Sequence, residues 1–165
     1  MTRIRPDQLL LPSVLDRLLD DEPDVQTETE RTRSQKLRDL KLSVRRDLEQ
    51  LLNTRVCLRE IPEDCEQVVT SVLNYGIPDF GGVAMGSREH QEALRSRVED
   101  VIQRFETRFK RVRVELVQDA DNVHRRVVQF RIDGMLYAEP APEPVVFDST
   151  VSPLIGQFEV KASDS

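Results

Sequence analysis

Residues 104–117, RFETRFKRVRVELV, decide the fold, because the spacing of their apolar residues changes part-way along. Before Phe105, apolar residues gather on one helical face, which predicts an amphipathic helix over about 88–108. After Phe109 they alternate with charged residues, which predicts a β-strand with one face in water. The helix residues are Leu94, Val98, Val101, Ile102 and Phe105, and the strand residues are Val112, Val114 and Leu116.

Two further helices are expected upstream. Residues 33–53 carry one apolar stripe, and Thr32 with Gln35 supplies a capping-box pattern at its start. A shorter helix is expected over about 64–74, with an inward face. The stripe is Leu37, Leu40, Val44, Leu48 and Leu51, and the inward residues of the shorter helix are Val68, Val69, Val72 and Leu73.

Downstream, alternation predicts a second strand that pairs with the first as a hairpin, with Val128, Phe130 and Ile132 on its apolar face. VVFDSTV (145–151) and GQFEV (156–160) are two further candidates, and the prolines beside them favour sheet edges. Helices followed by strands predict an α+β fold, with amphipathic helices packed on one face of a small, mostly antiparallel sheet. We expect a tail over 1–32, one domain over 33–162 and a short tail over 163–165.

The connection VLNYGIPDFGGVAMGS (72–87) is rich in Gly and Pro, which raises the question of a phosphate-binding loop. It contains no G-K-S/T and no G-x-G-x-x-G sequence, and Lys and Arg are absent from 75 through 87. We therefore expect a tight connection between two helices that exposes Ile77 and Phe80.

Composition narrows the classes of function. The 165 residues carry 24 basic and 30 acidic side chains, a formal charge of −6. This charge argues against nucleic acid or an anionic membrane as the main partner. No apolar run is long enough to cross a membrane, and Cys57 and Cys65 fit reduced thiols in the cytoplasm.

The sequence shows no pattern of a nucleophilic active site, and its histidine count and cysteine spacing do not suit zinc. Two carboxylates suffice for glycan hydrolysis, so a lysozyme-like enzyme stays an alternative, as does a small cytoplasmic protein-binding adaptor. We expect a protein that is not an enzyme and has no cofactor, metal or small-molecule substrate.

Two segments are candidates for partner contacts. Residues 12–23, PSVLDRLLDDEP, predict a short helix on a polar tether, with Val14, Leu15, Leu18 and Leu19 on its apolar face. Such a helix is marginal alone, so it must dock on its own domain or on a partner. Glu106 and Arg108 lie where the helix of about 88–108 joins the first strand, and there they could form charge-assisted hydrogen bonds with a partner. The alternative is a solvated charged face.

Taken in order, PSVLDRLLDDEP, RRDLEQLLNTR, SVLNYGIPDF, IQRFETRF and VRVELV resemble the TssE family, the baseplate wedge proteins of type VI secretion systems. That family is related to the sheath-initiating wedge protein of contractile phage tails. The resemblance covers residues 12 to about 160. It implies a fold like the strand-exchange domain of the contractile sheath, and a cytoplasmic place in a membrane-docked baseplate.

The resemblance also implies partners and site residues. The partners would be the wedge proteins TssF, TssG and TssK and the sheath proteins TssB and TssC, without nucleic acid or membrane insertion. An E-P-R signature of the family, thought to dock on the wedge core, corresponds to Glu106, Thr107 and Arg108, with threonine in place of proline.

A sheet with edge strands offers unpaired backbone groups, to which a partner strand can add. We therefore expect residues 143–162 to form or border the surface that receives an extended arm of the sheath. The candidate contact residues in this region are Val146, Phe147, Phe158 and Val160.

Overall fold

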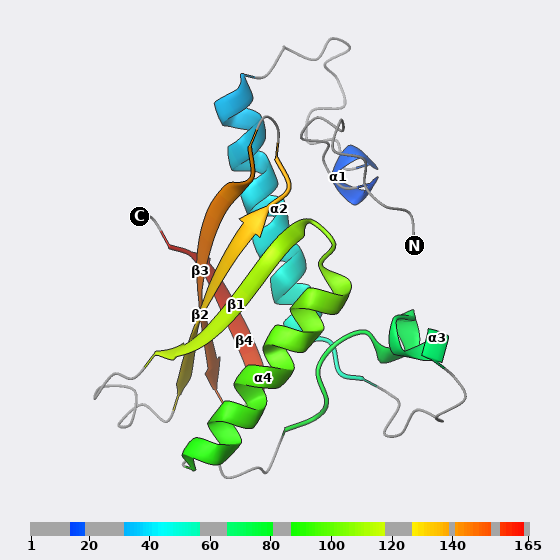
Figure 1. The fold of residues 1–165 in the computed structure, drawn as a ribbon, viewed down its shortest axis with the longest axis vertical. Helices are drawn as coiled ribbons and strands as arrows, with labels where there is room; N and C mark the ends of the chain where they lie inside the picture. The colour runs from blue at the N-terminus through cyan, green and yellow to red at the C-terminus, as the bar shows by residue number, and fades with distance from the viewer. Residues whose placement is uncertain are drawn as a thin grey trace.

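The computed structural model of the chain describes residues 14–18, 32–56, 66–80, 87–117, 127–138, 141–152 and 156–163. The two long helices pack against a single sheet, and the two short helices lie to the side of it (Figure 1). The elements, in chain order, are α1 (Val14–Leu18), α2 (Arg33–Asn53), α3 (Glu66–Val69), the 3-10 turn η1 (Val72–Asn74), α4 (Arg88–Phe105), β1 (Phe109–Val117), β2 (Val128–Leu136), β3 (Glu143–Ser152) and β4 (Gln157–Ala162).

The sheet has four strands in the order β1-β2-β3-β4, and each pair is antiparallel. Helix α4 packs against β1, and α2 packs against β4. One face of the sheet joins both helices in a single apolar core, while the other face carries charged residues. The α+β prediction is therefore confirmed.

The long helix α2 begins as its sequence predicts. The Thr32 side chain accepts from the backbone of Gln35 at 3.4 Å, and the Gln35 side chain accepts from the Thr32 backbone at 2.8 Å. This capping box satisfies amides that the first turn of a helix leaves unpaired. Leu40, Val44 and Leu48 of its stripe are buried.

The helix expected over 64–74 is broken. Residues Glu66–Val69 are α-helical, and Ser71 then caps a separate 3-10 turn by accepting from the Leu73 amide. Val72 and Leu73, expected to face inward, are 83% and 56% exposed. The prediction failed because the Ser71 side chain competes with the helix for backbone hydrogen bonds.

The connection after η1 buries the residues that were expected to be exposed. Ile77 exchanges backbone hydrogen bonds with Thr54 and Val56, at 2.9 and 3.1 Å, and its side chain is 1% exposed. Gly76 permits this approach, because its φ is 108° and an added Cβ would lie 2.3 Å from the Thr54 carbonyl oxygen. Phe80 is also buried, with its ring edge-on to Phe158. The Gly/Pro-rich segment thus turns the chain and helps to close the core.

The expectation of two late edge strands is correct for β4 and wrong for β3, which lies between β2 and β4. Pro144 tolerates this position because it lies near the start of β3, opposite Met135. Among the described residues, the pairing of β4 with β3 reaches Phe147, one further bond joins Ser163 to the Val146 carbonyl, and no β4 residue is paired with Pro144.

The side chains of Phe147, Phe158 and Val160 belong to the core, with exposed fractions of 1%, 3% and 1%. Their alternation along β3 and β4 turns them toward the helices, whereas Val146 lies on the opposite, half-exposed face. Phe147, Phe158 and Val160 therefore do not offer their side chains to a partner, which corrects that expectation. A contact through Val146 or through the backbone of β4 stays a prediction.

Gly134 provides a test of how β1 and β2 pack. An added Cβ there would lie 2.3 Å from Cε1 of Phe109, whose ring occupies the space above the glycine. We expect Gly134→Ala to lower the free energy of unfolding by about 1–3 kcal/mol, because the inserted methyl overpacks the core. Chemical denaturation measures this change.

The matched control is Phe109→Leu, alone and combined with Gly134→Ala. The double variant should lose less stability than the two single losses added together, because both act through one contact. Strict additivity would contradict the packing of Phe109 over Gly134.

Candidate functional site

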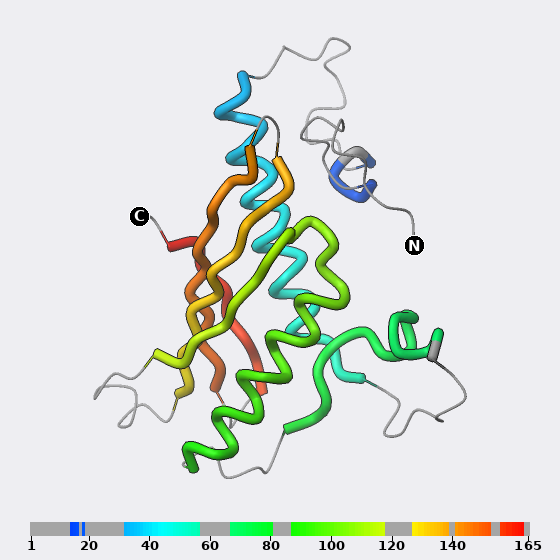
Figure 2. Tube along the Cα trace, viewed as in Figure 1, coloured from blue at the N-terminus to red at the C-terminus, as the bar shows by residue number. Residues whose placement is uncertain are grey.

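A tight corner joins α4 to β1 (Figure 2). The last hydrogen bond of the helix runs from the Glu106 amide to the Ile102 carbonyl, at 2.9 Å. The Phe109 amide then donates to the Glu106 carbonyl at 3.3 Å, which closes a turn. Helix α4 thus ends at Phe105, three residues before the expected position. Phe105 packs edge-on against Tyr75, at 5.3 Å between ring centroids.

Glu106 and Arg108 meet across this corner. Arg108 Nε lies 2.7 Å from Glu106 Oε1, and Arg108 Nη2 lies 2.5 Å from Glu106 Oε2. The Arg108 amide adds a third bond to Oε1 at 3.1 Å. This is the two-pronged arrangement that makes arginine–carboxylate pairs strong and directional. Between the pair, Thr107 is exposed at the tip of the turn.

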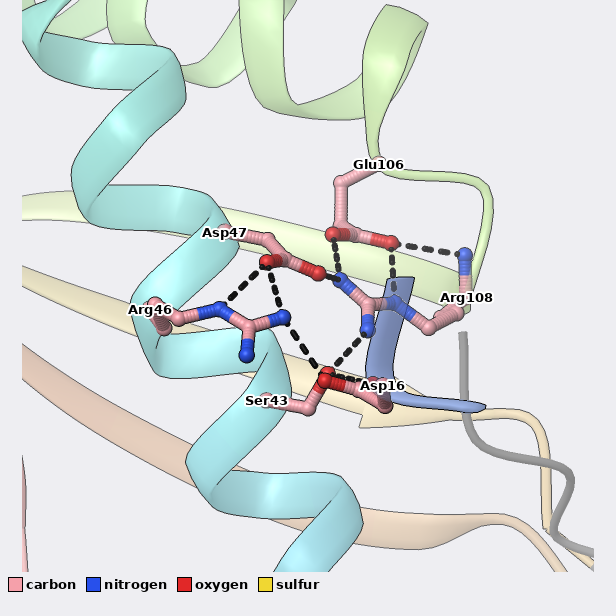
Figure 3. A network of polar contacts seen from close by, with 6 residues as sticks. All are labelled: Asp16, Ser43, Arg46, Asp47, Glu106 and Arg108. Carbon is pink, nitrogen blue, oxygen red and sulfur yellow. Dashed lines mark hydrogen bonds and ion pairs between the residues drawn. The ribbon is translucent and has the colours of Figure 1, made fainter. Parts of the chain in front are cut away.

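Helix α2 holds the other side of the Arg108 guanidinium (Figure 3). Asp47 accepts from Nη2 at 2.7 Å, and the Ser43 hydroxyl accepts from Nη1 at 3.0 Å. Ser43 and Asp47 are four residues apart, so they lie one turn apart on the same face of α2. The corner between α4 and β1 is therefore fastened to the first long helix.

The N-terminal helix α1 reaches the same cluster through Asp16. Its carboxylate accepts from Ser43 Oγ at 2.5 Å and from Arg46 Nη2 at 2.7 Å. Arg46 also binds Asp47, at 2.9 Å from Nη2 and 3.1 Å from Nε. Two segments expected separately from the sequence, the N-terminal helix and the Glu106–Arg108 pair, thus form one site. Leu19, also expected on the apolar face of this helix, lies outside the described residues.

We call these six residues the corner cluster: Asp16, Ser43, Arg46, Asp47, Glu106 and Arg108. Its three carboxylates and two guanidiniums give a net charge of −1. Glu106 is 8% exposed, whereas the Arg46 side chain is 32% exposed. The cluster is therefore buried at the corner and partly exposed to solvent at Arg46.

The ion pairs keep both guanidiniums charged. Burial acts against the charge of Arg108, but hydrogen bonds and the negative charge of Glu106, followed by those of Asp47, outweigh it and raise the pKa of Arg108. Hydrogen bonds to Asp16 and then Asp47 raise the pKa of Arg46. Burial, then the charges of Asp47 and Glu106, raises the pKa of the neighbouring Tyr75. The arrangement serves to fix positions rather than to move protons.

Helix side chains cover parts of both sheet edges. Asn53 of α2 binds both backbone groups of Phe158, each at 2.9 Å, and Arg45 Nη1 donates to the Val160 carbonyl at 3.2 Å. On β1, Glu99 and Arg95 of α4 bind the amide and carbonyl of Val114, at 2.8 and 3.0 Å. Such cover limits unwanted strand addition. Among the described residues, the last of these hydrogen bonds from α2 to β4 is at Val160, and the strand ends at Ala162.

Residues 38–141 match the family of the baseplate wedge protein gp25. The chain belongs to this family. The match begins within α2 and ends after β2, so it spans α4, β1 and every residue of the corner cluster except Asp16. Comparison with curated proteins gave no match, and comparison with solved structures gave none.

The family match confirms the resemblance to baseplate wedge proteins that the sequence showed, and proteins of this family have a structural role in the baseplate. Within the described residues, no helix is long and apolar enough to cross a membrane. The same part of the chain contains no group of three or more His, Cys, Asp and Glu side chains placed to hold a metal ion.

The sequence patterns did not predict that Ser43, Arg46 and Asp47 of α2 belong to the site. One signal was present: Ser43 and Asp47 lie beside the apolar stripe of Leu40, Val44 and Leu48, at the border of a face that is otherwise buried. A buried polar residue needs a partner. Which partner it has depends on the packing of α4 and α1 against α2, and the sequence does not specify this packing.

Arg108→Met tests the stability of the cluster, because it removes the guanidinium and leaves Glu106 buried without its partner. We expect the free energy of unfolding to fall by about 3–5 kcal/mol, as for broken buried ion pairs. The matched control is Arg131→Met, which breaks an exposed pair with Asp148 on the outer face of the sheet. That change should cost about 0–1 kcal/mol. Similar losses in denaturant titrations of both variants would contradict the structural role of Arg108.

Thr107→Pro tests the geometry of the turn. Thr107 is the second residue of the turn, a position where proline is common. A proline clashes with an α-helical residue before it, but Glu106 has a ψ of 86° and is not α-helical, so proline is compatible with this turn. We expect a gain of about 0.4–1 kcal/mol in unfolding free energy, because proline restricts the unfolded chain. Thr107→Ala, as control for loss of the side chain, should change it by less than about 0.5 kcal/mol. A large loss in the proline variant would show that the turn differs.

Proposed function

We propose that this chain is a structural component of a type VI secretion baseplate, which docks on the wedge core and initiates polymerisation of the contractile sheath. Its membership of the gp25 baseplate wedge family over residues 38–141 carries this proposal. The resemblance of its sequence to TssE favours the type VI system over a phage tail. In this role the chain would act in the cytoplasm, within a baseplate held at the membrane.

The wedge contact would include the corner and α1. Glu106 and Arg108 hold the corner in shape, and Thr107 with the exposed rim of Arg108 would meet the wedge. Helix α1 would insert apolar side chains into a groove of a wedge protein, because Leu15 and Leu18 are 47% and 76% exposed. TssF, TssG and TssK are the proposed partners.

The sheath contact would use the backbone of β4. This strand is one edge of the sheet, and the cover from Asn53 and Arg45 ends at Val160. An extended arm of TssB or TssC would add beside residues 160–162, where main-chain hydrogen bonds provide affinity. The β1 edge is less suited, because Arg95 and Glu99 occupy its backbone at Val114 and Gln103 Nε2 lies 3.4 Å from the Val112 carbonyl.

Co-purification tests this proposal. The tagged chain is expressed with TssF, TssG, TssK, TssB and TssC, as wild type and as Glu106→Ala/Arg108→Ala. The double change removes both charges of the buried pair, so neither group is left without the other. We expect the wild type to retain the wedge proteins. The double variant should retain less of them by a factor of about ten or more, as for a central hot spot.

The control is Arg131→Ala/Asp148→Ala, which makes the same change in charge on the outer face of the sheet. Circular dichroism verifies that each variant folds. A wild type that retains none of these proteins would overturn the baseplate assignment. Equal retention by wild type and corner variant would keep the assignment and move the wedge contact away from the corner.

A further inference from the structure

Helix α1 is held with Asp16 turned inward and with Val14 and Leu18 turned outward. The Asp16 side chain is 16% exposed and bonded to α2, whereas Val14 and Leu18 are 74% and 76% exposed. Residues two apart on a helix lie on nearly opposite faces, because each residue turns about 100°. Fixing Asp16 against α2 therefore turns Val14 and Leu18 away from the chain, one turn apart on the same face.

We propose that Asp16 is a positioning residue, which fixes α1 beside the Glu106–Arg108 corner so that helix and corner meet one partner as a single surface. This inference rests on the proposed function and adds to it. The contact residues assigned above, Leu15 and Leu18, do not explain how a five-residue helix takes up a defined position. Asp16 explains it, because its carboxylate supplies the bonds that join α1 to α2.

Ser43 and Arg46, the two residues that bond to Asp16, are themselves held in place by other residues of the cluster. Arg46 is held by two bonds to Asp47, and the Ser43 hydroxyl accepts from Arg108 while it donates to Asp16. The same hydroxyl therefore contacts both the N-terminal helix and the corner. A helix this short is unstable alone, and an anchor that orders it before binding reduces the entropy lost on association.

The exposed face of α1 indicates the chemistry of the partner. Val14 and Leu18 form the i, i+4 pair by which an amphipathic helix anchors in an apolar groove. The cluster residues beneath the helix are two carboxylates and two guanidiniums, so they carry no net charge and apolar contact is the main attraction. We assign the surface to a wedge protein with an apolar groove, in line with the proposed function.

A charge exchange tests the anchor. The full chain is prepared as wild type, Asp16→Arg, Arg46→Asp, and the double variant, which restores an opposite-charge pair in reverse. The order of residues 14–18 in the isolated chain is measured by heteronuclear ¹⁵N relaxation, which reports motion on the picosecond to nanosecond scale. Capture of TssF, TssG and TssK is measured in parallel, and thermal unfolding verifies the fold.

We expect each single variant to lose order at residues 14–18 and to capture about tenfold less wedge protein, and the double variant to recover both. A single variant that loses order and captures as much as the wild type, or more, would overturn the positioning role. Order that is unchanged in Asp16→Arg would overturn the anchor itself. A wild type that captures no wedge protein would refute the proposed function, and the relaxation result would still decide whether Asp16 anchors α1.

Discussion

The guanidinium of Arg108 is the group on which the arrangement of this chain depends. It bonds to Glu106 within its own turn and to Asp47 and Ser43 on α2. Its side chain is 18% exposed, so its charge is stabilised mainly by these neighbours rather than by water. The point where the chain changes from helix to strand is thereby fixed against the first long helix, and α1 joins the same cluster through Ser43.

This organisation suits a part that other proteins assemble on. A wedge protein needs a surface with a fixed shape, and the corner cluster holds one end of α4 in place with ion pairs that stay charged. The sheet edges are partly covered by α2 and α4, which leaves the end of β4 as the accessible portion of its edge. Wedge and sheath contacts would then lie on different elements, so the chain could bind both at once.

Sequence patterns predicted the elements well where one local signal dominates. The capping box at Thr32, the apolar stripe of α2 and the alternation in β1 each depend on residues a few positions apart. The patterns failed at Ser71, where local side-chain hydrogen bonds compete with the helix, and at Ile77, which is buried because the distant residues 54–56 pair with it. At the candidate site, Glu106 and Arg108 were expected to face a partner, and they face each other and α2 instead.

By itself, the sequence determined the α+β class, the bounds of α2 and the alternation of the strands, because helix and strand periods are properties of neighbouring residues. It also placed a glutamate and an arginine at the corner. The tertiary structure decided which groups those two residues bind, that β3 lies inside the sheet, and that α1 turns its apolar face outward. The cluster contacts join residues as far apart as Ser43 and Arg108, which are separated by 65 positions, and the place of β3 depends on backbone pairing with strands on both sides. Such pairing has no local signal.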